Sequence, residues 1–359
     1  MPQTNPAFDT PTMRRARPVL LLGYGSIQQT TNQLLAALHD DLDRSIGSRL
    51  AIHALPQGVM AKILFQIQNL VASYRDISHS SGLVIYASAA LSLFHVLWAR
   101  LLGRRVTILI WDLYPDAKVH EGAAKATSLA TRLYALTERF ALRRASVIAV
   151  PSSDYSGHPY FRGFDNLRQL PLWPTLALQP PRSRTPWQPG SDRPVEIAFA
   201  GQNLASRGIN EAIEKLRRVF TGPLRLSIFE PGRTVRETRS PSPDVAIDLM
   251  PEVPHGDLPK ALDGFDFGLV AIQPDYPLPC APSKTLLYVA ARLPILYHGP
   301  HNAFMEDFVG GRIGMTITQL ESAKELSDRW SAMQDEVEDN FERIYAELLV
   351  SEKKIAEIF

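Results

Sequence analysis

The feature that most constrains the fold is a repeated alternation between apolar runs of strand length and segments with helical periodicity. In the first half of the chain, strands are expected at 19–22, 83–86, 106–111 and 147–150, and helices at 29–42, 91–102 and 126–144. Continuous apolar strands joined by helices are typical of parallel sheets covered on both faces. This half therefore predicts a doubly wound α/β domain.

A proline-rich stretch between residues 171 and 194 interrupts the alternation. It holds seven prolines in 24 residues. Proline fixes φ and removes a backbone donor, which excludes an interior helix or a central strand. We interpret the stretch as an interdomain linker.

A second alternating series follows the linker. Strands are expected at 195–199, 224–229, 245–249, 267–272 and 295–297, and helices at 210–220, 256–262 and 283–292. A length of 359 residues also favours two domains. The predicted fold class is α/β, with two Rossmann-like doubly wound domains facing each other across a cleft, where ligands of such folds bind.

The expected domain boundaries follow from these patterns. They are a loose N-terminal tail at 1–17, an N-terminal domain at 18–170, the linker at 171–194, a C-terminal domain at 195–340, and a C-terminal helix at 341–359 that can cross back to the N-terminal domain.

Composition excludes several classes of protein. Lys plus Arg number 38 and Asp plus Glu 37, a net charge of +1, so a nucleic-acid partner is not expected. Cys280 is the only cysteine, which excludes an intramolecular disulfide and a cysteine-based zinc site. These features predict a folded protein of a reducing compartment, in the cytoplasm.

Three apolar segments raise the question of membrane contact. The run at 19–22 is too short for a signal peptide. The uncharged stretch at 77–99 contains histidines, serines and a change of texture, so we expect a strand, a turn and a helix there. The segment at 59–74 is apolar on one side, which fits either peripheral contact with the inner membrane or, as we favour, a core helix with a wide apolar face.

The strongest local signal for ligand binding is the sequence Pro282-Ser283-Lys284 at the start of an expected helix. A helix N-terminus offers unpaired N–H groups, and a lysine in its first turn adds a full positive charge, so a diphosphate is well placed there. The alternative is an ordinary N-capping serine.

Two glycine-containing loops also follow expected strands. The loop from Gly201 and Gln202 to Arg207 would let a ligand approach the backbone, and Arg207 could hold a phosphate in bidentate fashion. The first-domain loop with Gly25 and Ser26 lacks the third glycine of the dinucleotide fingerprint. A nicotinamide cofactor is therefore not expected.

A carboxylate follows the expected strand at 106–111. Asp112 stands just beyond the strand end, where a side chain faces the cleft, with Asp116 close behind it. The alternative is an aspartate that caps the next turn before Pro115.

Metal binding is not expected. Asp41 and Asp43 form an Asp-X-Asp sequence, but on the polar face of an expected helix, and His298 and His301 have no evident third ligand.

Together these residues resemble the family 4 glycosyltransferases, in matching order from about residue 19 to residue 316. The stretch 282–295 is similar to that family's donor-site helix, and Ala200-Gly201 with Arg207-Gly208 is similar to its phosphate loop. The sequence Trp-Asp-Leu-Tyr-Pro-Asp at 111–116 resembles an element of its bacterial polysaccharide members. Weaker similarities are 249–258, which contains Val253, to the nucleobase loop, and 170–174 to the segment entering the hinge.

The chain departs from the family pattern at several positions. The family has two glutamates eight residues apart at the donor site, and here those positions hold Pro279 and Leu287. Its usual glycine is Arg292, and its usual phosphate-loop arginine is Gln202. The motifs alone therefore do not carry over the family's retaining chemistry.

The resemblance implies a GT-B glycosyltransferase that needs no metal or other cofactor. Its partners would be a nucleotide diphosphate sugar and a glycan or lipid-linked acceptor in bacterial polysaccharide synthesis. The donor would be bound by Gly201, Gln202, Arg207, Val253, Pro282, Ser283, Lys284 and Leu287, with Gly25, Ser26 and Asp116 in the N-domain cleft loops. We hypothesise that Asp112 is the base of an inverting transfer. The alternatives are an inactive GT-B subunit that binds a partner or nucleotide, and a nucleotide-sugar epimerase.

Overall fold

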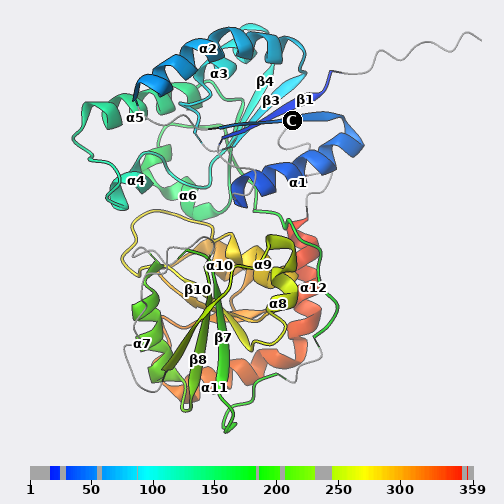
Figure 1. Ribbon diagram of the computed structural model, residues 1–359, viewed down its shortest axis with the longest axis vertical. Coiled ribbons are helices and arrows are strands. Elements are labelled where there is room, and N and C mark those ends of the chain that lie inside the picture. The colour runs from blue at the N-terminus through cyan, green and yellow to red at the C-terminus, as the bar shows by residue number, and fades with distance from the viewer. Residues whose placement is uncertain are drawn as a thin grey trace, which may run out of the picture.

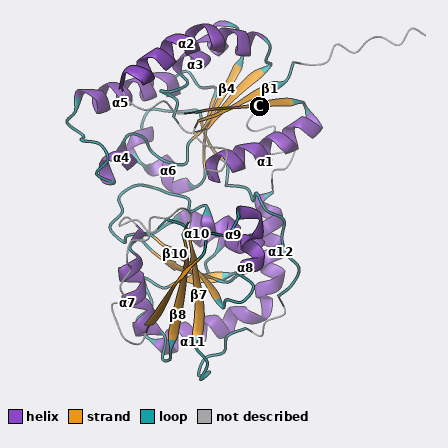
Figure 2. Cartoon of the chain, in the orientation of Figure 1, coloured by secondary structure: helices purple, strands orange, loops and turns teal. Residues whose placement is uncertain are grey.

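The computed structural model describes residues 17–24, 30–54, 59–86, 88–182, 186–202, 207–230 and 245–349, together with Lys354. Within these ranges the chain forms two α/β domains, one above the other along the long axis of the molecule (Figure 1). Each domain has a six-stranded parallel sheet with helices packed against it (Figure 2).

The strand order of the N-terminal sheet changes direction at β1, as in a doubly wound fold. In sheet order the strands are β2 (Ser48–His53), β1 (Val19–Tyr24), β3 (Gly82–Tyr86), β4 (Arg105–Leu109), β5 (Val147–Val150) and β6 (Leu167–Gln169). The helices are α1 (Thr30–Ser45), α2 (Val59–Ser78), α3 (Leu93–Leu101), α4 (Asp116–His120), α5 (Leu129–Leu142) and α6 (Ser153–Gly157), with a 3₁₀ turn η1 (Pro159–Phe161).

The C-terminal sheet repeats this organisation. In sheet order its strands are β12 (Gly314–Thr316), β11 (Ile295–His298), β10 (Phe267–Ala271), β7 (Val195–Ala200), β8 (Leu224–Phe229) and β9 (Val245–Met250). Its helices are α7 (Ile209–Val219), α8 (Leu258–Ala261), α9 (Lys284–Ala290), α10 (Ala303–Phe308), α11 (Ala323–Met333) and α12 (Val337–Leu348), with 3₁₀ turns η3 (His255–Asp257) and η4 (Gln334–Glu336).

The central strands confirm the predicted alternation. Every residue of β1, β3 and β5 is buried, as expected for strands covered on both faces. Helix α7 buries its apolar side chains at helical spacing, including Ile209, Ile213 and Leu216. The predicted fold class is thus confirmed for both domains.

The strands that the sequence did not predict lie at or near sheet edges. They are β2, β6 and β12, which contain Arg49, Arg168 and Gly314 among their residues. Edge strands pair with a neighbour on one side only, and they are commonly short or carry charged residues that discourage pairing with another chain. The predicted strand at 106–111 ends earlier, since Ile110 and Trp111 lie beyond β4.

The proline-rich stretch contains no helix or strand in its described residues. It is nevertheless packed against both domains. The indole nitrogen of Trp173 donates to the Leu34 carbonyl of α1 (2.8 Å), and the Trp187 carbonyl accepts from the indole of Trp330 (2.7 Å). The linker is therefore anchored at both ends.

The two expected terminal segments are described only in part. Arg17 donates to the Ser78 carbonyl (2.9 Å), and residues 1–16 lie outside the described ranges. The hydroxyl of Tyr345 on α12 donates to the Leu176 carbonyl of the linker (3.1 Å), and the charge of Asp41 helps to raise the pKa of Tyr345. Helix α12 therefore approaches α1 of the N-terminal domain.

One expectation about an apolar helix face is wrong. The helix at 59–74, which we favoured as a core helix, exposes Leu64, Ile67, Leu70, Val71 and Tyr74. The helix predicted at 126–144 also exposes a stripe of apolar side chains, at Leu129, Leu133, Leu136 and Phe140. Periodicity reveals a stripe but not the direction in which it points.

The uncharged stretch at 77–99 forms the end of α2, strand β3 and helix α3, as predicted. Among the helices described, none combines the length and the apolar character needed to cross a membrane.

Candidate functional site

The carboxyl ends of strands from both sheets meet at the domain interface, and several contacts cross it. The rings of His120 and Tyr276 lie 4.8 Å apart, edge to face. The Asp154 carboxylate on α6 accepts from the backbone N–H of Ala303 at the start of α10 (2.6 Å) and lies 3.8 Å from the ring nitrogen of His301. The two domains therefore contact each other where these strands end.

On the C-terminal side, Lys284 extends from the start of α9 over the end of β7. Its side-chain nitrogen lies 3.6 Å from the centre of the Phe199 ring and has no hydrogen-bond partner within the described residues. Burial, reinforced by the nearby Arg207 charge, holds the pKa of Lys284 well below its ordinary value. An anion beside this nitrogen would stabilise its charged form.

Gly201 makes room for Lys284. Its φ is +141°, a conformation that favours glycine. A Cβ atom at this position would lie 3.3 Å from the Lys284 nitrogen. The backbone turn after β7 therefore favours glycine, and any larger residue there would also press on the end of the lysine side chain.

Tyr288 fixes α9 against the sheet. Its hydroxyl accepts from the Ala200 N–H (2.9 Å) and lies 3.2 Å from the carbonyls of Ala198 and Leu269. A Cβ at Gly268 would lie 2.7 Å from its ring, so only glycine fits there. Lys284 lies one helical turn before Tyr288 on α9, so these contacts also fix the position of the lysine. Sequence reasoning did not assign this role to Tyr288.

Arg207 is positioned by the glycine that follows it. Gly208 has φ +58° and precedes α7, and a Cβ there would lie 2.9 Å from the Cα of Gln273, just beyond β10. The Arg207 charge acts on Lys284, Asp112, Tyr276 and Cys280, as the pKa shifts of these four groups record. Arg207 therefore lies near ionisable groups of both domains.

Asp112 enters from the N-terminal domain. The preceding Trp111 is clamped between the rings of Tyr86 (4.4 Å) and Trp173 (5.4 Å), and its carbonyl accepts from the Tyr155 hydroxyl (2.5 Å). The Asp112 side chain is exposed, yet the surrounding protein raises the pKa of its carboxyl, and Arg207 opposes that rise.

The capping alternatives for Asp112 and Ser283 are not supported. Helix α4 begins after Pro115, and the Asp112 carboxylate makes no hydrogen bond or ion pair with the described residues. Ser283 precedes α9 without a side-chain capping hydrogen bond. Asp116 is the exposed first residue of α4.

The remaining predicted residues are dispersed. Gln202 is exposed, Pro282 is buried, and Val253 packs partly buried against the C-terminal core. Leu287 belongs to the same core, so the position of a family glutamate is apolar here. Gly25 and Ser26 lie outside the described residues.

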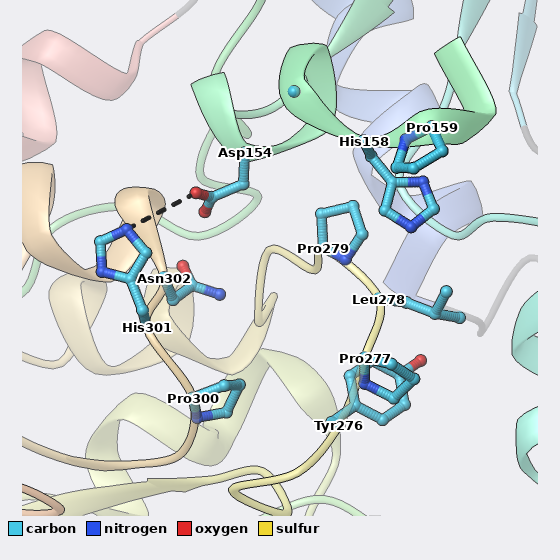
Figure 3. A pocket seen from close by; sticks show the side chains of 11 residues that line it. Asp154, His158, Pro159, Tyr276, Pro277, Leu278, Pro279, Pro300, His301 and Asn302 are labelled. Carbon is cyan, nitrogen blue, oxygen red and sulfur yellow. Dashed lines mark ion pairs between the residues drawn. The ribbon is translucent and has the colours of Figure 1, made fainter. Parts of the chain in front are cut away.

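A cavity of about 280 Å³ opens at the domain interface (Figure 3). Polar groups of Asp154, His158, Tyr276, His301 and Asn302 line it, along with a run of prolines that includes the other family glutamate position, Pro279. Sequence reasoning missed Asp154, although it follows the end of β5 much as Asp112 follows β4.

Arg292, where the resembling family has glycine, has a structural role. It is buried at φ +51° and its guanidinium donates to Glu338 (3.0 Å) and Glu342 (2.8 Å) of α12 and to the Gln179 carbonyl (2.7 Å). The arginine thus joins α9, the linker and the C-terminal helix.

The described residues contain no cluster of three or more His, Cys, Asp or Glu side chains suited to a metal ion. Asp41 pairs with Arg44 on α1 (2.6 Å), and Asp43 accepts from the Ser48 N–H (3.2 Å).

Burial raises the pKa of Cys280 to about 12, which keeps its thiol protonated.

No protein-family model matches the chain, and no curated protein matches it either. Its fold is similar to that of the lipopolysaccharide outer core galactosyltransferase WaaB, with a TM-score of 0.56, 10% identity, and coverage of 92% of this chain and 96% of the other. It is also similar to the catalytic domain of starch synthase IV from Arabidopsis thaliana, with a TM-score of 0.55, 8% identity, and coverage of 92% and 95%. The chain therefore has the two-domain GT-B fold of glycosyltransferases.

Proposed function

We propose that this chain is a glycosyltransferase that moves a sugar from a nucleoside diphosphate donor to a glycan or lipid-linked acceptor in bacterial polysaccharide synthesis. One observation carries the proposal: the charge of Arg207 in the C-terminal domain acts both on the Asp112 carboxylate of the N-terminal domain and on the buried Lys284 amine. The fold similarity is consistent with this activity.

The two cations are suited to hold the donor diphosphate. Lys284 has a buried nitrogen without a hydrogen-bond partner in the described residues, and a phosphate oxygen would supply one. Arg207 offers a planar fork for a second phosphate oxygen. Together they would stabilise the charge that grows on the diphosphate as it leaves.

Asp112 is suited to act as the base on the acceptor. In an inverting transfer, the acceptor hydroxyl oxygen attacks the anomeric carbon while the bond from that carbon to the phosphate oxygen breaks. Asp112 takes the hydroxyl proton, and the diphosphate leaves with the electron pair. The positions of the family's two glutamates hold Pro279 and Leu287, and Leu287 is buried, which favours this scheme over retention.

Nucleotide binding tests the donor assignment. We expect one of UDP, GDP, ADP or TDP to raise the melting temperature of the wild type, because a ligand that binds only the folded state stabilises it. Arg207→Gln should weaken that nucleotide at least about tenfold, since charge-assisted hydrogen bonds to phosphate are worth roughly 1.5 to 3 kcal/mol. Arg217→Gln, at an exposed position of α7, is the matched control.

Turnover separates the transferase from the two alternatives. Incubation of the matching nucleotide sugar with acceptor mixtures should release the nucleotide and form a glycoside. Nucleotide binding without turnover in any mixture would favour the inactive subunit. An altered sugar that forms without any acceptor would favour the epimerase.

A further inference from the structure

Helices α2, α3 and α5 cover one side of the N-terminal sheet, on the part of the domain far from the C-terminal sheet (Figure 1). Helix α3 lies between the other two and contacts both. The indole nitrogen of Trp98 on α3 donates to the Leu70 carbonyl of α2 (2.8 Å), and its ring lies 5.0 Å from that of Tyr74.

The outer helices are inverted with respect to an ordinary surface helix. Helix α2 buries Asn69 and Ser73, and exposes the apolar side chains of Ile67 and Val71. A soluble surface helix places its apolar stripe toward the core. Packing among the described residues therefore does not explain the 76% exposure of Val71.

Helix α5 shows the same inversion. It buries the carboxylate of Glu138, which accepts hydrogen bonds from Ser88 (3.0 Å) and from the N–H groups of Ala89 (3.1 Å) and Ala90 (2.6 Å). Its apolar stripe faces outward, with Leu129 exposed by 72%. We define the apolar face as Ile67, Val71, Tyr74, Leu129, Leu133 and Leu136.

Among the described residues of these three helices, the exposed charged side chains are all basic. Arg75, Arg100 and Arg132 are exposed on the three helices, and Arg143 follows α5. The two acidic residues of these helices do not offset this charge, because Asp76 pairs with Arg49 (2.7 Å) and Glu138 is buried. Since the whole chain carries a net charge of only +1, this positive excess is local.

We propose that the apolar face docks on an anionic lipid bilayer. Apolar side chains surrounded by basic ones enter the headgroup boundary, while the basic groups are attracted to anionic lipids. The aromatic pair Tyr74 and Trp98 suits the same interface. A second copy of the chain would bring two basic rims together, which disfavours a symmetric dimer through this surface.

The inference goes beyond the proposed transfer and uses none of the cleft residues. A bilayer attached to α2 and α5 would leave the domain interface uncovered, because that interface lies at the opposite side of the N-terminal domain (Figure 1). Failure of the membrane inference would therefore leave the proposed transfer untouched, and the converse also holds.

Vesicle sedimentation of the full chain tests whether the apolar side chains contribute to membrane binding. The wild type should sediment with phosphatidylcholine vesicles that contain phosphatidylglycerol, and much less with phosphatidylcholine alone. Val71→Gln combined with Leu136→Gln should lower the partition coefficient at least about tenfold, with unchanged circular dichroism and melting temperature because both side chains are exposed. Leu249→Gln, exposed on β9 of the other domain, is the matched control.

A second pair of variants tests whether the exposed arginines contribute to membrane binding. Arg132→Gln combined with Arg143→Gln should weaken binding to the anionic vesicles and make it less sensitive to added salt. Arg343→Gln on α12 is the control. The proposal is wrong if the wild type stays in the supernatant, if neutral vesicles bind it equally well, or if the Val71/Leu136 double variant sediments like the wild type. A dimer that the same double variant breaks, without vesicle binding, would assign the face to self-association instead.

Discussion

The side-chain nitrogen of Lys284 lies 3.6 Å from the centre of the Phe199 ring, in contact with a π face and with no hydrogen-bond partner among the described residues. A cation–π contact of this kind stabilises a lysine charge only in part. The desolvated amine is therefore best satisfied by an anion that binds next to it.

Proton uptake on nucleotide binding tests that interpretation. Between its lowered pKa and the ordinary value of 10.5, the free amine is neutral, and a bound diphosphate should restore its proton. Titration calorimetry in buffers of different ionisation enthalpy, from about pH 7 to about pH 9.5, should show net proton uptake on nucleotide binding. Lys284→Met should abolish it. Binding with no buffer dependence over this range would contradict the lowered pKa.

Gly201→Ala should weaken both stability and binding. Its φ of +141° is strained for alanine, and the new methyl group would press on Lys284. We expect a loss of about 1 to 3 kcal/mol in the free energy of unfolding, with weaker nucleotide binding. Gly190→Ala has a similar backbone problem at φ +80° without neighbours within 4 Å. It should therefore lose stability in urea but keep its nucleotide affinity.

The buried strands could be predicted from sequence, because a continuous apolar run has few alternatives to a covered parallel strand. Asp112 and Lys284 could be proposed for the same reason, since the ends of such strands and the helices after them face the cleft. Edge strands such as β12 could not, because three residues that include a glycine carry no periodic signal.

Contacts between distant segments were beyond sequence reasoning. The departure of Arg292 from the family glycine was visible, but its partners Glu338 and Glu342 lie on a helix about 50 residues away. The outward direction of the α2 and α5 stripes was hidden for a related reason. Buried polar groups such as Glu138 decide which side of a helix faces inward, and their partners are on other elements.

Two substitutions at Arg292 distinguish the cost of backbone strain from the loss of side-chain contacts. Arg292→Gly removes the ion pairs to α12 but suits the φ of +51°, so we expect a loss of about 1 to 2 kcal/mol. Arg292→Ala removes the same contacts and keeps the strain, which adds about 1 kcal/mol. Urea unfolding should rank the wild type above the glycine variant and the glycine variant above alanine. Equal stability of the two variants would remove the strain argument.

Glu138 predicts a pH dependence of stability. Burial raises the pKa of its carboxyl from 4.5 to about 7. Between these values the folded state holds a proton that the unfolded chain has lost, so the free energy of unfolding should fall as pH rises, by up to about 3 kcal/mol. Glu138→Gln should flatten this slope, and Glu214→Gln on α7 should retain it. An unchanged slope in Glu138→Gln would assign the dependence to other groups.

The most direct test of the account compares Asp112→Asn with Asp116→Asn in the transfer reaction. Both changes remove a carboxylate and keep the side-chain shape, but the Asp112 carboxylate feels the charge of Arg207 across the domain interface, whereas Asp116 is the first residue of α4. We expect Asp112→Asn to lower turnover by about 10² or more with donor affinity nearly unchanged, Asp116→Asn to resemble the wild type, and NMR coupling constants to show an inverted product anomer. Wild-type turnover in Asp112→Asn, or a product that keeps the donor's anomeric configuration, would contradict the proposed mechanism.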